Sequence, residues 1–120
     1  MATAVKRKLS DSTDGLPIKI SATGSVGTSI HTAVAGTTAG TFDEIWVYGQ
    51  NNYTSSNVSV TIEYGSADAP GGNIIASLPA VSGLQLLVPG LILQNSKTVK
   101  AFASVADVVS LSGFVNSVTD

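Results

Sequence analysis

The sequence lacks the residues on which most small catalytic and metal sites depend. Its 120 residues include no cysteine and a single histidine, His31. The absence of cysteine excludes disulfide scaffolds, cysteine-ligated zinc and thiol catalysis. His31 has no second histidine with which to share a metal ion and lacks the spacing of a Ser-His-Asp triad, so we expect a hydrogen-bonded structural residue. We therefore expect no enzyme activity, no cofactor and no metal.

Charge is scarce as well. Charged residues make up 12% of the chain and the formal net charge is −2, whereas about 25% of the residues in a typical domain are charged. A nucleic-acid-binding protein normally presents a basic face, so no nucleic-acid partner is expected. Because charge is depleted in the cores of protein interfaces, the composition favours a surface that partly faces other protein chains. A monomer covered by Thr, Ser and Asn is the alternative.

No long hydrophobic run is present. The longest, at 84–93, is interrupted by Gln85, Pro89 and Gly90, and it is too short to cross a bilayer. The basic N-terminal residues lead into Asp11 rather than into an apolar segment, so no secretory signal is expected. These absences predict a protein made in the cytoplasm, with no membrane partner.

The chain consists instead of short β-type runs separated by Gly, Asn, Ser and Asp. In the clearest run, Val58, Val60, Ile62 and Tyr64 alternate with polar residues, which predicts a strand with one buried and one solvent-facing side. The other runs lie at 17–20, 29–34, 43–49, 73–78, 84–93, 97–105 and 108–118. No window combines a helical apolar period with helix caps, so an all-β fold is expected.

About eight strands at roughly ten-residue spacing predict a β-sandwich or barrel, and the jelly roll is the natural eight-stranded solution. We place this β-sandwich domain at residues 17–120. Residues 1–16 show no sustained period and are expected to form an extended N-terminal arm. Within the run at 84–93, Pro89 and Gly90 predict a turn or a bulge, because proline cannot donate a ladder hydrogen bond.

The expected arm carries a basic cluster of Lys6, Arg7 and Lys8. Such a cluster binds nucleic acid, docks on an acidic protein surface, or remains a solvated tail. Three charges are few for a nucleic-acid-binding arm. The electrostatic part of the affinity grows with the number of phosphates neutralised, and three cations neutralise few of them. Docking and solvation are therefore the stronger alternatives.

Aromatic residues are the other candidates for a binding surface. Trp46, Tyr48 and Tyr53 are large amphipathic side chains, of a kind enriched at protein interfaces, and they are also suited to stacking on sugar rings. Trp46 is expected first as a core residue, and Tyr53, in a polar loop, as an exposed one. The adjacent carboxylates Asp43 and Glu44 should point to opposite faces of a strand, so they predict no acid–base pair.

Eight segments spread over almost the whole chain form a set: KRKLS (6–10), GLPIKI (15–20), IHTAVAGTT (30–38), DEIWVY (43–48), TIEYG (61–65), VPGLIL (88–93), VKAFA (99–103) and SGFVN (112–116). Together they resemble a widespread group of small virion proteins of tailed bacteriophages that are found near head genes. These motifs are structural, and the resemblance implies no catalytic residue.

The resemblance implies a component of the phage particle, and above all a capsid decoration (cement) protein that binds the outside of the major capsid shell and stabilises it. The implied partner is the major capsid protein, with the arm docked on the shell at the capsid surface. A homotrimer or another homo-oligomer is expected, because closed symmetry is usual for small oligomers. The alternatives are a tail or head–tail joining component, and a glycan-binding adhesin module that uses Trp46, Tyr48 or Tyr53.

Overall fold

The chain folds into β-strands, as the alternating runs predict. A computed structural model describes residues 2–68 and 70–120. Within these residues there is no helix, and hence none long and apolar enough to cross a membrane. The strands are β1 (Thr3–Lys8), β2 (Ile18–Lys19), β3 (Thr28–Thr32), β4 (Phe42–Asn51), β5 (Val58–Tyr64), β6 (Asn73–Leu78), β7 (Ser82–Leu93), β8 (Thr98–Ala103) and β9 (Val109–Thr119).

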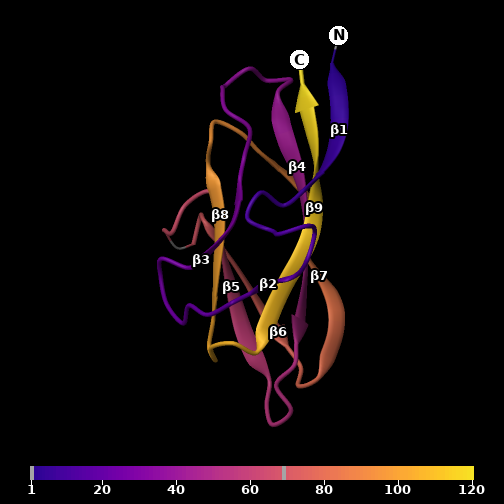
Figure 1. Ribbon diagram of the computed structural model, residues 1–120. Helices are drawn as coiled ribbons and strands as arrows, with labels where there is room; N and C mark the ends of the chain where they lie inside the picture. Colours follow the sequence, from indigo (N-terminus) through magenta and orange to yellow (C-terminus); the bar gives the residue numbers. More distant parts are fainter. Residues whose placement is uncertain (1, 69) are drawn as a thin grey trace.

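These strands form two antiparallel sheets that pack against each other (Figure 1). The five-stranded sheet has the order β1-β9-β4-β7, with β2 beside β9, and the four-stranded sheet has the order β3-β8-β5-β6. Buried side chains from both sheets form one hydrophobic core, which is the arrangement of a β-sandwich. The largest fully buried side chains are Leu9, Ile20, Ile30, Ile45, Ile62, Leu78 and Leu111.

The strands of the first half of the chain pair with those of the second half in reverse order. β1 and β2 pair with β9, β3 with β8, β4 with β7, and β5 with β6. The chain changes sheet at every connection except those between β1 and β2 and between β5 and β6. The fold is therefore a set of nested antiparallel pairs wrapped around the core.

Strand β5 is more buried than its alternation predicts. Val58, Val60 and Ile62 face the core as expected, but Thr61 and Glu63 on the other side are buried too. The loop before β3 covers this side, because the Glu63 carboxylate accepts hydrogen bonds from the Ser25 hydroxyl and the Gly27 backbone N–H. The expectation of a solvent-facing polar side is thus wrong at these two positions.

The N-terminal segment belongs to the sandwich, so a separate arm is not confirmed. Met1 lies outside the described residues, but Thr3–Lys8 is extended and pairs along its whole length with β9. Leu9 is completely buried in the core, and Ser12 is buried as well. The sequence pattern missed this strand because every residue of β1 is exposed and leaves no alternation to detect.

Strand β7 is an edge of the five-stranded sheet, since in the described part of the chain it pairs with β4 alone. Leu91 lies opposite Ile45 and Pro89 lies opposite Trp46, so Gly90 is the additional residue of a β-bulge. Gly90 has a φ of 77°, which glycine adopts without strain. Of the two possibilities for Pro89 and Gly90, the structure has the bulge.

Candidate functional site

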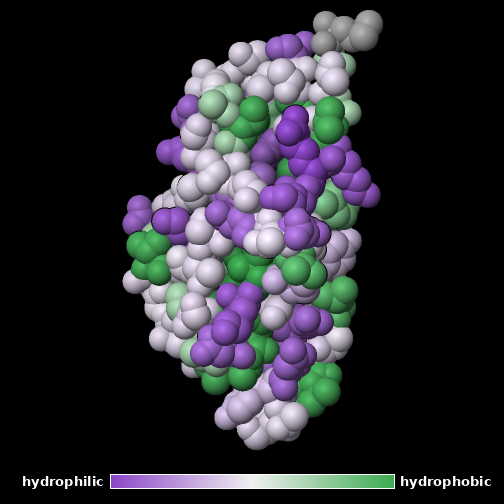
Figure 2. Space-filling view, in the orientation of Figure 1, coloured by the Kyte–Doolittle hydropathy of each residue, from purple (hydrophilic) through white to green (hydrophobic). Residues whose placement is uncertain are grey.

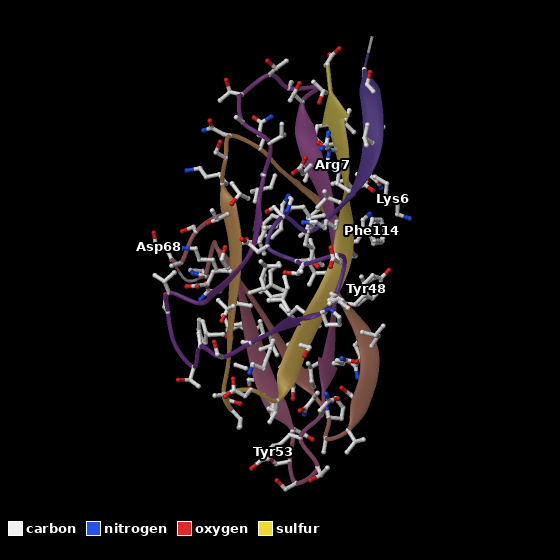
Figure 3. All side chains as sticks on the ribbon, viewed as in Figure 1. Lys6, Arg7, Tyr48, Tyr53, Asp68 and Phe114 are labelled. Atoms are coloured by element: carbon white, nitrogen blue, oxygen red, sulfur yellow. The ribbon has the colours of Figure 1, made fainter. Side chains whose placement is uncertain are left out.

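The basic cluster lies on an edge strand, and its three side chains have different surroundings. Lys6 is opposite Asn116 and Lys8 is opposite Phe114, whose side chains lie on the outer side of the five-stranded sheet. Because side chains alternate along a strand, Arg7 lies on the other side, towards the end of the sandwich (Figure 3). Lys6 and Arg7 thus lie on opposite sides of the strand and do not form one continuous patch.

Lys6 belongs to a row of side chains that crosses the outer side of the five-stranded sheet. Its Nζ lies 4.3 Å from the centroid of the Phe114 ring, a cation–π contact. The Phe114 ring stacks on Trp46 with an interplanar angle of 14° and centroids 6.2 Å apart. On the other side of Trp46 the chain passes at Gly90, where an added Cβ would come within 2.7 Å of the indole ring. This row joins β1, β9, β4 and β7.

Trp46 is therefore not a core residue, contrary to expectation. Along β4, Ile45 and Val47 are buried while Trp46 and Tyr48 are half-buried on the outer side. Figure 3 shows Lys6, Phe114 and Tyr48 on the same side of the sheet. No local sequence signal places Trp46, because β4 has large apolar residues on both of its sides.

The Glu44 carboxylate links Trp46 and Asn116 on this surface by hydrogen bonds. One carboxylate oxygen accepts hydrogen bonds from the Trp46 indole N–H at 2.7 Å and from the Asn116 amide at 3.0 Å. These two bonds, first that of Trp46 and then that of Asn116, lower the pKa of Glu44 below its ordinary value of 4.5. The carboxylate thus orients the indole and is itself already engaged.

Tyr53 lies far from this row, at the opposite end of the molecule from the chain termini (Figure 3). It packs partly buried against the hydrophobic core, although its polar loop predicted an exposed side chain. Its backbone N–H donates to Asn51, and its carbonyl accepts from Val81. Of the three candidate aromatics, Trp46 and Tyr48 share a surface and Tyr53 does not.

His31 is a buried structural residue, as expected, and its partner is Asp43. Both side chains are 5% exposed, and His31 Nε2 lies 2.7 Å from an Asp43 carboxylate oxygen. The Ser10 backbone N–H donates to His31 Nδ1 at 2.9 Å, so Nδ1 is an acceptor and Nε2 carries the proton given to Asp43. The second Asp43 oxygen and the Tyr64 hydroxyl are buried and have no hydrogen-bond partner among residues 2–68 and 70–120. Burial, and then the Asp43 charge, raise the Tyr64 pKa above its ordinary range.

Ser10, His31 and Asp43 are the residue types of a hydrolytic triad, but their hydrogen bonds differ from those of a triad. A nucleophilic serine gives its hydroxyl proton to histidine. Here the histidine is held by the backbone N–H of Ser10, while the Ser10 hydroxyl oxygen accepts from the Thr32 N–H at 2.7 Å. The imidazole therefore has no free nitrogen with which to activate that hydroxyl.

A cavity of about 680 Å³ opens beside this cluster at the end of the sandwich. Arg7 and Lys8 line it together with His31, Asp43 and Ser117. Lys8 is partly engaged, because its Nζ donates to the Ser12 carbonyl at 2.8 Å. Among the residues that the structure describes, no three His, Cys, Asp or Glu side chains gather where they could hold a metal ion.

Comparisons of the chain with family models, with curated proteins and with solved structures gave no match. No relative's functional residues can therefore be transferred to this chain. The surfaces described above are its candidate sites.

Proposed function

We propose that this chain is a capsid decoration (cement) protein of a tailed bacteriophage, which binds the outside of the major capsid shell and stabilises it. The observation that carries the proposal is the distribution of charge on a rigid sandwich. Lys6, Arg7, Lys8 and Lys19 all lie on β1 and β2, at one edge of the five-stranded sheet, and β7 at the other edge has no charged residue. A basic edge suits docking on an acidic protein surface.

We assign the sandwich to the jelly-roll class. The nested pairing of β1 with β9, β3 with β8, β4 with β7 and β5 with β6 supports this assignment. Four such pairs divided between two sheets are what two interlocked Greek keys produce, and viral capsid proteins use this architecture. The sequence resemblance to small phage virion proteins favours the same setting.

A decoration protein acts through contact area and rigidity and needs no catalysis. The hydrogen bonding of His31 and Ser10 fits this role, because it locks the N-terminal segment onto β3 and offers no activated nucleophile. We accordingly propose a non-enzymatic virion protein at the capsid surface. Its partner is the major capsid protein, and it binds as a homotrimer or another homo-oligomer.

Two alternatives remain from the sequence, a tail or head–tail joining component and a glycan-binding module. The glycan alternative has less support from the geometry. The Trp46 ring is flanked by Phe114 and by the chain at Gly90, and Tyr53 packs on the core. Tyr48 alone of the three is left as a stacking platform, whereas sugar binding normally uses several groups.

The test is binding to undecorated shells assembled from the major capsid protein of the same phage. Of the six cationic residues of the chain, only Lys97 and Lys100 lie away from the basic edge. One variant replaces Lys6 and Arg7 by Gln, and the matched control of equal charge change replaces Lys97 and Lys100 by Gln. We expect the first to weaken cosedimentation with shells on the order of tenfold and the control to change it little.

Added salt should reduce binding of the wild-type protein, because rim charges are screened. Equal binding by the two variants would exclude the basic edge as the docking surface. Failure of the wild-type protein to bind shells would contradict the proposed function.

A further inference from the structure

The outer side of β4 and β7 is an exposed apolar surface. On β7, Leu84 is 62% exposed, Leu86 46% and Ile92 58%. Tyr48 lies opposite Leu86, and Trp46 lies opposite Pro89, so side chains of the two strands adjoin along the sheet. We call this surface the β4–β7 face. Its residues are Phe42, Trp46, Tyr48, Leu84, Leu86, Pro89 and Ile92.

This face is almost free of charge. From Ala69 to Ser96 the sequence has no Asp, Glu, Lys, Arg or His. The carboxylate of Glu44, which lies opposite Ile92, already accepts two hydrogen bonds. Three of the large apolar side chains that are exposed among the described residues lie on this face, namely Leu84, Leu86 and Ile92. In Figure 2 hydrophobic colour recurs along the lower right-hand rim, where Figure 1 places part of β7.

We propose that the β4–β7 face is the docking site for a second copy of this chain, like face against like face across a two-fold axis. Such a contact places identical surfaces against each other, and an uncharged apolar face meets its own copy without like-charge repulsion. The opposite edge, with Lys6, Arg7 and Lys8 on β1, would repel its copy. A charged partner would find no complementary charge on the β4–β7 face, whereas the basic edge offers one.

The size of the face fits a subunit contact. β7 has 12 residues, and at ~3.3 Å per residue a strand of this length spans about 40 Å. Two strands with their side chains are about 15 Å wide, so the face covers on the order of 600 Å². Specific protein interfaces bury about 600–1,000 Å² on each partner. The area of the β4–β7 face therefore reaches the lower end of the range for a stable contact.

The bulge in β7 favours a closed contact over open-ended strand pairing. A long, flat, apolar edge strand is a template for unlimited β-pairing, and proline and bulges are devices that interrupt it. Strand β7 has a proline, Pro89, and a bulge, at Gly90, and both interrupt this edge. Association through side chains of the β4–β7 face remains possible, so a discrete oligomer is expected rather than fibres.

Native mass spectrometry and sedimentation of the purified protein test the proposal. We expect the wild-type protein to be oligomeric, and Leu86→Glu and Ile92→Glu each to weaken association about 30-fold or more, as for a buried interface residue. The matched control is Leu16→Glu, which changes an equally exposed leucine (60%) away from the face. Circular dichroism verifies that each variant is folded. A wild-type protein that is monomeric at about 100 μM would overturn the proposal, since ordinary interfaces form well below this concentration.

A second measurement uses smaller substitutions that should not disturb folding. The chain has no cysteine, so Leu86→Cys introduces a unique thiol on the face and Val26→Cys one elsewhere. As the protein concentration rises, the Leu86→Cys thiol should become about tenfold slower to label, while the Val26→Cys thiol keeps its rate. Equal labelling of both thiols in an oligomer would place the interface elsewhere and overturn the proposal.

This inference adds a surface to the proposed function without depending on shell binding. A protein that forms oligomers through this face but fails to bind shells contradicts the proposed function alone. A monomer that binds shells contradicts the β4–β7 interface alone.

Discussion

At the scale of single residues, the buried pair of His31 and Asp43 links three parts of the fold. His31 on β3 holds the Ser10 backbone through Nδ1 and the Asp43 carboxylate of β4 through Nε2. The Val34 N–H donates to the same Asp43 oxygen at 3.2 Å. A charge this deeply buried is tolerated only while it is paired, so the pair fixes where the N-terminal segment meets both sheets.

Replacing His31 by leucine should destabilise the protein by about 3–5 kcal/mol, because it leaves the Asp43 carboxylate buried without its partner. Leucine keeps most of the volume, so a cavity contributes little. The double variant His31→Leu/Asp43→Leu should recover part of the loss, since it removes the buried charge but leaves the Ser10 and Val34 N–H groups without their acceptors. Urea denaturation measures the free energies of unfolding. A loss below about 1 kcal/mol in the single variant would contradict a paired buried charge.

Glu44 and Trp46 give the surface row a pH-dependent signal. Hydrogen bonds from Trp46 and Asn116 lower the pKa of Glu44, so these bonds are kept above its ordinary value of 4.5 and lost only as the pH falls through the lower folded value. Trp46 is the only tryptophan of the chain. Its fluorescence should therefore titrate with a midpoint below 4.5, and Glu44→Gln should abolish the transition. A midpoint at or above the ordinary value would mean that the indole bond is absent in solution.

At the scale of elements, β1 is an exposed strand anchored at its end. All six of its residues are exposed, while Leu9 directly after it is completely buried. Leu9→Ala should cost about 2–5 kcal/mol of stability, as for other leucines in a core. Val5→Ala, within β1, should cost less than about 1 kcal/mol. Thermal or urea unfolding compares the two variants. Equal small losses would mean that residues 1–16 are a detached arm after all.

The bulge of β7 lies directly against the Trp46 ring. Gly90→Ala adds a Cβ at 2.7 Å from the indole and at a positive φ, so it should destabilise the protein by about 2–4 kcal/mol and alter Trp46 fluorescence. The matched control is Gly83→Ala in the same strand, where nothing lies within 4 Å of the added atom. A result in which both variants unfold at the same denaturant concentration would argue against the close packing of Trp46 on β7.

The elements that the sequence predicts are those with one apolar and one polar side. The all-β fold, the run that became β5 and the bulge near Pro89 follow from alternation and turn chemistry. Trp46 was misplaced because β4 is apolar on both sides, so its parity cannot tell core from surface. Glu63 was misplaced because its cover comes from a distant loop. The meeting of Lys6, Phe114 and Trp46 depends on sheet order, which local patterns do not contain.

At the scale of the whole molecule, the two edges of the five-stranded sheet are chemically different. β1 and β2 carry cations, and β7 carries none and presents leucine and isoleucine side chains. In the proposed account the basic edge meets the capsid shell and the β4–β7 face meets further copies. Each copy would then bind both the shell and a neighbouring copy. Because the two contacts are linked, the overall affinity for the particle exceeds that of either contact alone.

A cryo-electron microscopy map of phage particles that contain this chain tests the central claim most directly. The account predicts density for the sandwich at many symmetry-related positions on the outside of the shell, with β1 towards the major capsid protein and the β4–β7 faces of neighbouring copies in contact. A single ring of copies at the head–tail junction, or a shell whose outer surface lacks this density, would contradict it.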